Sequence, residues 1–277
     1  MPETFKIMTF NVRGSQHHDG ENAWKRRASL NARVIEKHAP DVIGFQEHQV
    51  GNRSVHDEKL RGYKRISGPR YENRKPHAHN AIYWRTDRLE LVERGGFWLS
   101  ETPEEYSRSW EARHVRSANW ARFRLLSERF GGAEFVHLNT HLDHISGHAR
   151  QQGARLIIQR LEELADGLPI VMTGDFNCDP GSTTYDIFAE AGFSDAHIVA
   201  GNGRTNTFHR FRGEEFSPKK TEREVRIDWI LLRDAPEQAR WTVHSCETIR
   251  DAEPPVYPSD HYPVVARLSL ETKSPSV

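Results

Sequence analysis

Residues 169–177 read Pro-Ile-Val-Met-Thr-Gly-Asp-Phe-Asn, an apolar run of strand length that ends on polar side chains. Side chains two positions apart along a strand point to the same face, so Asp175 and Asn177 share one. A carboxylate and an amide in that arrangement can hold and orient one attacking water, and Gly174 allows close approach of the backbone. An Asp-Xaa-Asn sequence alone is more often a turn. The interpretation as a site therefore depends on whether the rest of the chain repeats the pattern.

The pattern does recur, because several apolar runs end on, or begin with, a group that carries chemistry. The side chains in question are Asn11, Glu47, His141, Asp228, Asp260 and His261. In layered α/β folds the ends of strands meet at a crevice where catalytic groups gather. One such residue would be a turn former, whereas a set of carboxylates, amides and imidazoles predicts a site.

Strands and helices alternate in the predicted secondary structure. The apolar runs of strand length are residues 5–12, 41–46, 81–84, 120–126, 135–142, 169–176, 227–232 and 264–268. Residues 24–38, 148–165 and 182–191 have helical patterns, the second with a clear apolar stripe and the third capped by Ser182 or Thr183. No repeat, linker or low-complexity tract divides the chain. We therefore predict a single domain over residues 1–277, an α/β sandwich with its helices outside.

Composition excludes several classes of protein. The 277 residues include 39 Lys and Arg against 39 Asp and Glu, so the formal net charge is zero. Hydrophobic residues make up 36% and charged residues 28%, which excludes wholesale disorder and leaves no global positive charge to grip nucleic acid. Three long polar loops, residues 68–80, 100–118 and 201–226, are rich in Arg, Lys and His. If they gather on one face, they would attract an anion locally.

The N-terminus and the cysteines indicate the compartment. Residues 1–7 lack the apolar stretch of a signal peptide, and no run approaches the ~20 apolar residues of a transmembrane helix. Cys178 and Cys246 could form at most one bridge, and nothing suggests a disulfide scaffold or a thiolate zinc site. We expect a soluble cytoplasmic protein without a membrane partner or an obligate protein partner.

Two carboxylates lie in apolar surroundings and therefore need partners. Glu47 follows the apolar residues 43–46, and Mg²⁺ or Mn²⁺ bound to it would explain its place; a salt bridge to an arginine is the alternative. Asp228 lies inside the run 227–232, where His261 is a candidate partner. Such a pair raises the pKa of the ring, so that an imidazolium could bind a phosphate and stabilise developing charge. A purely structural buried pair is the alternative.

Sixteen histidines raise the question of a zinc site. On a helix, His141, His144 and His148 would share one face and could bind zinc. However, the strand-like run 135–142 passes through His141, and the helix begins only near Gly147, which favours His141 as an acid catalyst or phosphate contact. Other histidines fall in loops, where we expect exposure to solvent: His17, His18, His77, His79, His114 and His209.

Six stretches together resemble the endonuclease/exonuclease/phosphatase superfamily of metal-dependent hydrolases. They are Met-Thr-Phe-Asn at 8–11, Gly-Phe-Gln-Glu at 44–47, Asn-Thr-His-Leu at 139–142, Thr-Gly-Asp-Phe-Asn at 173–177, Arg-Ile-Asp-Trp-Ile at 226–230 and Ser-Asp-His-Tyr-Pro at 259–263. They follow the order of the family and span nearly the whole chain. The run 174–182, followed by a helix, is most similar to the deadenylase-like and uncharacterised bacterial branches.

The resemblance implies a four-layer α/β sandwich in which two mixed β-sheets pack face to face with helices outside. It also implies a metal-dependent phosphoesterase, a nuclease or a phosphatase, that hydrolyses a phosphodiester or phosphomonoester by in-line attack of an activated water. The cofactor would be Mg²⁺ or Mn²⁺, and the partner a phosphate-containing substrate, with nucleic acid and nucleotides among the candidates. Two alternatives stay open: a non-catalytic module that binds a phosphate ligand on the same fold, and a zinc hydrolase that uses His141, His144 and His148.

The resemblance also assigns roles to particular residues. The metal-site residues would be Asn11, Glu47 and Asp260, and the catalytic residues His141, Asp175, Asn177, Asp228 and His261. Asp175 would activate the water and Asn177 would position it, while Asp228 and His261 would form the pair at the scissile phosphate. His141 would protonate the leaving group or bind the phosphate. Three aromatic residues are candidates for stacking a base or sugar, with core packing as the alternative: Trp98, Trp120 and Phe208.

Overall fold

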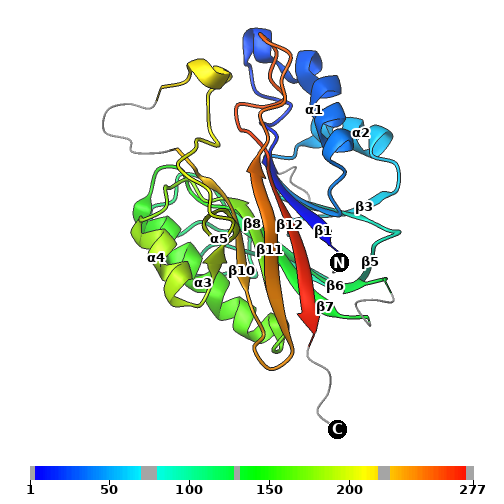
Figure 1. Ribbon diagram of the computed structural model, residues 1–277. Coiled ribbons are helices and arrows are strands. Elements are labelled where there is room, and N and C mark those ends of the chain that lie inside the picture. Colours follow the sequence, from blue (N-terminus) through cyan, green and yellow to red (C-terminus); the bar gives the residue numbers. More distant parts are fainter. Residues whose placement is uncertain (1–3, 70–79, 128–131, 218–224, 273–277) are drawn as a thin grey trace.

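The computed structural model describes residues 4–69, 80–127, 132–217 and 225–272, and its strands form two six-stranded mixed sheets (Figure 1). The strand order in the first sheet is β11 (Ala239–Thr248), β12 (Val264–Thr272), β1 (Phe5–Asn11), β2 (Val42–Gln46), β4 (Ala81–Arg85) and β3 (Tyr63–Ser67). The order in the second sheet is β5 (Leu89–Trp98), β6 (Ser117–Leu125), β7 (Glu134–His141), β8 (Ile170–Asp175), β10 (Asp228–Arg233) and β9 (Ser194–Asp195). Each sheet contains one parallel pair, β1 with β2 and β7 with β8.

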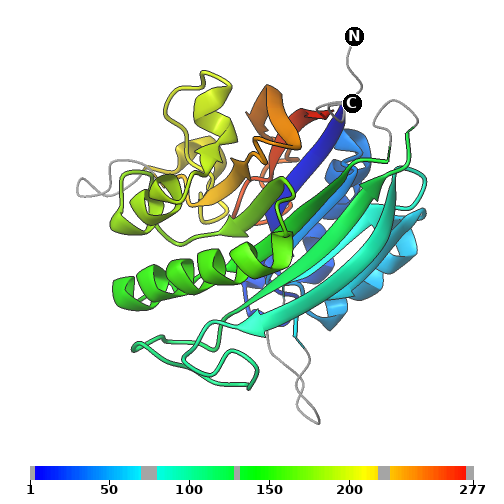
Figure 2. The ribbon, with the colours of Figure 1, turned by 90° about the horizontal axis from the view of Figure 1, so that it is seen from below.

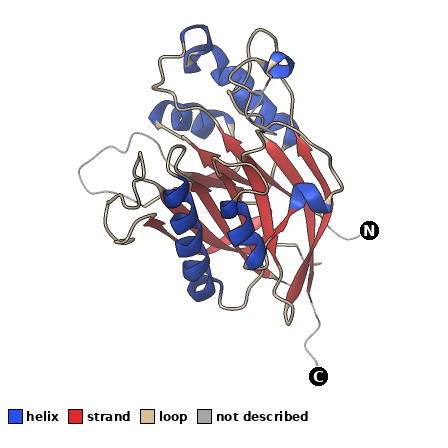
Figure 3. Ribbon diagram, turned by 90° about the vertical axis from the view of Figure 1, so that its left-hand side faces the viewer, coloured by secondary structure: helices blue, strands red, loops and turns tan. Residues whose placement is uncertain are grey.

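Helices cover the outer faces of the two sheets. The first sheet is covered by α1 (Trp24–His38) and α2 (Val50–Lys59), and the second by α3 (Gly147–Ala165) and α4 (Thr183–Glu190). Shorter elements are η1 (Gly20–Asn22), α5 (Ala196–Val199) and η3 (Gly213–Glu215). Figure 2 shows the long α3 alongside its sheet, and Figure 3 shows the helices outside the strands.

Three apolar clusters hold these layers together. Ile7 and Ile230 belong to the cluster between the two sheets, which seals their inner faces. Leu161 of α3 packs in a second cluster, between the second sheet and its helices. Val34 of α1 packs in a third cluster, between the first sheet and α1. Removing this apolar area from water is the main force that holds the layers face to face. The four-layer α/β sandwich predicted from the sequence is confirmed.

Some helices and strands lack the apolar pattern that predicts such elements from sequence, and the reason is physical. α2 has no apolar stripe, because its buried side chains are Asn52, whose Oδ1 accepts a hydrogen bond from the Gln49 N–H, and His56, whose Nε2 bonds to Asn31 Oδ1. β3, β5 and β11 are edge strands with many half-buried or exposed positions, so their sequences contain none of the apolar runs that predict a strand. The helix starts are more predictable: Ser182 Oγ accepts a hydrogen bond from the Tyr185 N–H at 3.3 Å, so it is the cap of α4.

Strand register brings the polar ends of the runs to one edge. Asn11 at the end of β1 lies opposite Gln46 at the end of β2. In the second sheet, Asp175 at the end of β8 lies between His141 on β7 and Asp228 on β10. Parallel pairing places the carboxyl ends of two strands side by side, and the antiparallel β10 contributes its first residue at the same level. The predicted convergence of strand ends is present.

A polar layer joins the two sheets inside the core, directly below that edge. Gln46 Nε2 donates to Asn139 Oδ1 at 2.7 Å, and Asn139 Nδ2 donates to the carbonyls of Phe45 at 2.8 Å and Ala81 at 3.2 Å. Thr173 Oγ1 also donates to Asn139 Oδ1, at 3.1 Å. Buried polar groups without partners are costly, so these bonds favour one alignment of the sheets over its neighbours.

Gly44 in β2 leaves the space that this polar layer occupies. A Cβ at this position would lie 2.0 Å from Thr173 Oγ1 and 2.6 Å from Asn139 Oδ1. We expect Gly44→Ala to lower the free energy of unfolding by about 3 kcal/mol, because either side chain must leave its rotamer. Urea unfolding followed by tryptophan fluorescence measures the change.

Gly147→Ala is the matched control for that substitution. A Cβ at Gly147, in the first turn of α3, would approach Arg150 Nη2 at 3.7 Å, an ordinary contact. Alanine is also the better helix former, so stability should stay level or rise. Equal losses in the two variants would show that Gly44 has no special role in the packing of the sheets.

More histidines are buried in the structure than the sequence suggests. Those buried in addition to His141 and His261 are His48, His56, His137, His197 and His209. The expectation of exposure is wrong for His209, whose ring stacks on Tyr262 with centroids 4.0 Å apart. It holds for His18, whereas His77 and His79 lie outside the described residues.

Two of these buried histidines make stability depend on pH. Burial lowers the pKa of His56 and of His137 to about 3, whereas the ordinary value is 6.5. Between those values the unfolded chain binds protons that the folded chain does not, so stability is complete above pH 6.5 and falls as the pH decreases. Each histidine should contribute about 1.4 kcal/mol per pH unit to this loss. Urea unfolding at a series of pH values measures the slope, which His137→Gln should reduce and His18→Gln should leave unchanged.

Candidate active site

A cavity of about 650 Å³ opens at the edge where the strands end, and both sheets contribute to its walls. Six of the eight predicted site residues line it: Glu47, His141, Asp175, Asn177, Asp260 and His261. The other two, Asn11 and Asp228, lie behind the wall and contact residues that line it. The eight residues therefore form one constellation, although they come from positions 11 to 261 of the chain.

Asp228 and His261 form the expected carboxylate–imidazole pair. His261 Nδ1 lies 2.9 Å from Asp228 Oδ2, and both side chains are buried. Burial disfavours the charged ring, but the charge and hydrogen bond of Asp228 outweigh it and raise the pKa of His261 to about 10. His261 Nε2 lies 3.8 Å from Asp175 Oδ2, so the ring stands between two carboxylates. The geometry holds a cationic imidazole at the cavity wall at neutral pH.

Asp175 is the most crowded carboxylate of the site. Its Oδ2 accepts a hydrogen bond from Asn11 Nδ2 at 2.9 Å and lies 3.3 Å from His141 Nε2, while its Oδ1 accepts from the Asn177 N–H at 3.0 Å. Burial and the nearby charge of Asp228 raise the pKa of Asp175 to about 7. A carboxylate with that pKa can accept a proton from water near neutral pH.

Two site residues have backbone conformations that side chains rarely adopt. Glu47 has φ of 55° and Asn177 has φ of 52°, both in the left-handed region. Asparagine tolerates this region, whereas for glutamate it is uncommon and strained. The conformation turns the chain sharply after β2 and β8, and both side chains then line the cavity. Asn177 Nδ2 is held by the Leu142 carbonyl at 3.0 Å.

Glu47 and Asp260 form an acidic corner of the cavity. Glu47 accepts hydrogen bonds from the Gly14 N–H at 3.2 Å and from His17 Nε2 at 2.9 Å. Burial alone would raise the pKa of Glu47, but these contacts hold it well below its usual range. Burial and the charge of Glu47 raise the pKa of Asp260, whose Oδ2 lies 3.8 Å from Arg13 Nε.

The donors in this corner suit a hard divalent cation. Glu47, which is partly exposed, and the buried Asp260 are like charges whose repulsion a cation between them would relieve, and carboxylate oxygens are the ligands that Mg²⁺ and Mn²⁺ prefer. Asn11 presents its Nδ2 to Glu47 Oε1 at 3.2 Å, while its Oδ1 accepts from the Arg13 N–H at 3.0 Å. Its amide therefore orients Glu47 in this structure and turns its oxygen away from that carboxylate.

Another group of ligand atoms lies deeper in the wall. One ligand atom each of Asp175, Asp228 and His261 lies within 4.8 Å of the others, close enough to share a metal ion. However, His261 Nδ1 and Asp228 Oδ2 already bond to each other, which leaves a weaker donor set than the acidic corner. Within the described residues, His141, His144 and His148 do not form such a group. His148 is exposed and interacts with Gln152 one turn along α3, so the arrangement does not support the zinc interpretation.

The basic loops reach this cavity, and they contribute residues that the motifs do not include. Asn80, Tyr106, Arg116 and Phe208 come from the three loops and line the cavity, although residues 70–79 and 218–224 lie outside the described residues. Trp98 also lines it, in T-shaped contact with Tyr106 at 4.9 Å. Of the three aromatic candidates, Trp120 instead belongs to the core cluster under α3.

Two of the histidines that we expected to be exposed, His17 and His114, line the cavity, and of these His114 is exposed as expected whereas His17 is only half-exposed. His17 bonds to Glu47, as described above, and His114 is stacked on His144 with centroids 5.2 Å apart. The position of His17, shortly after Asn11 in a polar loop, was the signal available for it. For His114 and Arg116 only the basic character of residues 100–118 pointed to the site.

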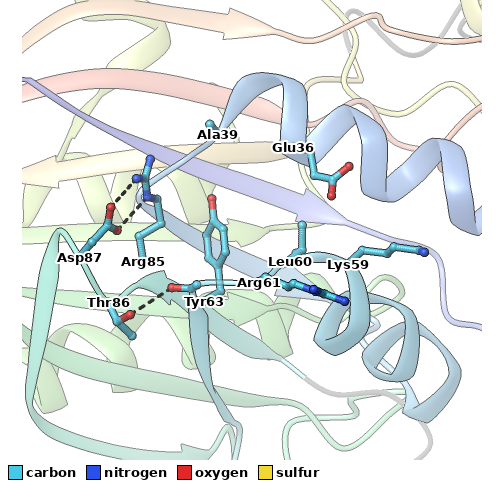
Figure 4. Close-up of a pocket in the computed structure, with 10 residues that line it drawn as sticks. Glu36, Ala39, Lys59, Leu60, Arg61, Tyr63, Arg85, Thr86 and Asp87 are labelled. Atoms are coloured by element: carbon cyan, nitrogen blue, oxygen red, sulfur yellow. Dashed lines mark hydrogen bonds and ion pairs between the residues drawn. The ribbon is translucent and has the colours of Figure 1, made fainter.

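A second, smaller cavity of about 300 Å³ lies at the opposite end of the first sheet (Figure 4). Arg85, which lines it, is the last residue of β4 and lies beyond the start of β2, far from Glu47 along that strand. Arg85 Nη2 pairs with Asp87 Oδ2 at 2.6 Å, and Thr86 Oγ1 donates to the Gly62 carbonyl at 3.3 Å. The charge of Arg85 is thus compensated by Asp87, and we assign no chemistry to this cavity.

Comparison with known proteins identifies the family. The chain belongs to the Endonuclease/Exonuclease/phosphatase family, whose model matches residues 8–261. The fold is therefore that of a family of phosphoesterases, which includes phosphatases and nucleases. Within the described part of the chain, no helix is both long enough and apolar enough to cross a membrane.

Solved structures with about 30% identity come from bacteria. A family member of Bacteroides thetaiotaomicron is 31% identical with a TM-score of 0.84, over 97% of this chain and 98% of that one. A mannosyl-6-phosphatase of Bacteroides thetaiotaomicron VPI-5482 is 30% identical with a TM-score of 0.83, over 96% of this chain and 99% of that one. Protein angel of Drosophila melanogaster is 27% identical over 172 residues, which are 58% of this chain and 46% of that protein. The bacterial matches agree with the branch suggested by the motifs.

The Asp228–His261 pair gives a testable property of the metal-free protein. Asp228→Asn removes the charge that raises the pKa of His261, while burial, which lowers it, remains. We expect the pKa of the ring to fall from about 10 by at least about two units, so that it loses its proton at a lower pH. NMR titration of the His261 ring measures the shift. The exposed Asp186→Asn is the control, and an unchanged ring in Asp228→Asn would refute the coupling.

Proposed function

We propose that this chain is a Mg²⁺- or Mn²⁺-dependent hydrolase that cleaves a phosphoester bond by in-line attack of water. The observation that carries the proposal is the cavity in which a carboxylate with a pKa near 7, a cationic imidazole and an acidic corner meet. These are the three components that such a reaction needs: a proton acceptor, a charge stabiliser and a cation site. The chain belongs to a family whose members typically depend on a divalent metal, which supports the proposed metal-dependent hydrolase.

The proposed roles follow from the contacts of each residue. Asp175 accepts the proton of the attacking water, and Asn177, whose N–H fixes the Asp175 carboxylate, positions water and phosphate. The cationic His261, held in one orientation by Asp228, stabilises negative charge that develops on the phosphoryl oxygens. His141 faces Asp175 from the neighbouring strand. Burial and the charge of Arg116 hold the pKa of His141 well below its usual range, so a neutral His141 donates a hydrogen bond to the phosphate or the leaving group.

Glu47 and Asp260 would hold the cation, with Asn11 orienting Glu47. When bound, the ion would neutralise charge on the phosphate and lower the barrier for departure of the alkoxide. The acidic corner formed by Glu47 and Asp260 lies beside Asp175 and His261. Asn11 connects the two groups, since its side chain contacts both Glu47 and Asp175.

The relatives support a phosphate-containing substrate. The mannosyl-6-phosphatase is a phosphatase by its name and covers nearly the whole chain, which makes phosphatase activity the first to test. Nucleotides and nucleic acids are further candidate substrates, and we propose a cytoplasmic location and a single domain over residues 1–277. The cavity volume, about 650 Å³, suits a small molecule or one or two nucleotide units.

Activity on a panel of phosphomonoesters and phosphodiesters should require added Mg²⁺ or Mn²⁺ and disappear with EDTA. We expect Glu47→Ala and His261→Ala to lower kcat at least about 100-fold, because each removes a charge that acts in the transition state. Glu58→Ala and His18→Ala, on the exposed surface, are matched controls.

Other outcomes would favour the alternatives. Full activity of either site variant would contradict the assigned roles. Binding of phosphate without turnover of any ester would favour a non-catalytic binding module. Stoichiometric zinc in elemental analysis, together with activity that zinc restores after chelation, would favour a zinc hydrolase.

A further inference from the structure

Arg116 is a charged residue of the cavity to which the proposed chemistry gives no contact with the substrate. It directly precedes β6, and its backbone carbonyl accepts a hydrogen bond from the Leu99 N–H at 2.8 Å, which fixes its place in the wall. The side chain lines the cavity. Its Nε is buried and has no hydrogen-bond partner, and no carboxylate in the described part of the chain forms an ion pair with it. A buried guanidinium donor without a partner is costly unless a ligand supplies the acceptor.

The other arginine of the cavity differs in this respect. Arg13 Nη2 pairs with Asp19 Oδ1 at 2.8 Å, and its Nε lies 3.8 Å from Asp260. Its charge is therefore already compensated by protein carboxylates. Arg116 is the cavity arginine that retains its donors for an incoming anion.

Arg116 also lines the same cavity as the reacting groups Asp175 and His141. Burial lowers its pKa, and the charges of Asp175 and Glu47 act in the opposite direction, so both carboxylates are within electrostatic reach. Arg116 in turn is the main charge that, after burial, lowers the pKa of His141. Because a guanidinium stays protonated in proteins, this position carries a permanent positive charge.

We infer that Arg116 binds a non-bridging oxygen of a terminal phosphoryl group, and that the substrate class is therefore a phosphomonoester. This inference rests on the proposed function and narrows it. A terminal phosphoryl group has three non-bridging oxygens, and besides the neutral donors Asn177 and His141 the site has three places where positive charge can receive them. They are the cation corner at Glu47 and Asp260, the His261 ring, and Arg116.

A diester would leave one of these places unused. It has two non-bridging oxygens and a single negative charge, and its second ester group would have to pass Arg116. A guanidinium beside an ester oxygen or an alkyl group would lose hydrogen bonds that it can make with water. The planar fork of arginine instead matches the oxygens of a phosphate dianion, which makes Arg116 a specificity-determining residue.

The inference can be tested with two substrates that share a leaving group, 4-nitrophenyl phosphate and methyl 4-nitrophenyl phosphate, in the presence of Mg²⁺. We expect Arg116→Gln to lower kcat/KM for the monoester about 10- to 100-fold, the usual effect of losing a charged hydrogen bond. The diester should lose at most about threefold, and Arg116→Lys should retain an intermediate monoester activity, because lysine keeps the charge without the fork. Arg113→Gln, which removes the same charge from an exposed position of the same loop outside the cavity wall, is the control.

Binding of inorganic phosphate, measured by calorimetry with Mg²⁺ present, gives a second readout that does not depend on turnover. Wild-type protein and Arg113→Gln should bind phosphate, and Arg116→Gln should bind at least about tenfold more weakly. Equal thermal stability of the variants without phosphate would show that the fold is intact. Equal losses on both esters, no loss on either, or phosphate binding that is unchanged or absent in the wild type would overturn the inference. If wild-type protein hydrolyses neither ester, the proposed function fails for these esters, and phosphate binding alone decides the role of Arg116.

Discussion

The hydrogen bonds that Asn139 makes across the interior, to Gln46 and to the Phe45 and Ala81 carbonyls, tie the second sheet to the first. Apolar contacts between two sheets tolerate small sliding movements, but a buried amide does not, because each displaced partner becomes an unsatisfied group. Glu47 is the next residue after Gln46, and Asp175 lies two positions after Thr173, which also bonds to Asn139. The alignment of the two halves of the active site therefore follows from this one polar layer.

Above that layer the site concentrates more negative charge than the surrounding protein would tolerate alone. Asp175, Asp228 and Asp260 are all buried, and Asn11 joins Asp175 to Glu47 through its two hydrogen bonds. His261 offsets part of this charge between Asp228 and Asp175. The remaining repulsion and the strained backbone at Glu47 both destabilise the folded state, and the packing of the rest of the protein offsets this cost. Such an arrangement makes sense at a site that receives a cation and an anionic substrate.

Much of this could be predicted, and what could not has physical reasons. Strands buried on both sides leave long apolar runs, so β1, β2, β7, β8, β10 and β12 were recognisable, and so were the polar groups at their ends. Edge strands such as β11 bury little, and α2 turns a polar face inward through Asn52 and His56, so neither has an apolar signature. His209 reads as a loop residue, yet it is buried against Tyr262, because a histidine in a loop carries no sign of what will cover it.

The sequence by itself determined the layered α/β class and the eight residues of the candidate site, since both depend on a local pattern of apolar runs and their polar ends, and its six short motifs carried the resemblance to the family. Tertiary structure decided what those groups do to one another: the pKa of His261 follows from a contact with Asp228, 33 positions away. It also placed His17 on Glu47 and left Arg116 without an ionic partner among the described residues, facing the cavity. Distances between side chains from different strands set these charges, and strand register, which no single segment encodes, sets the distances.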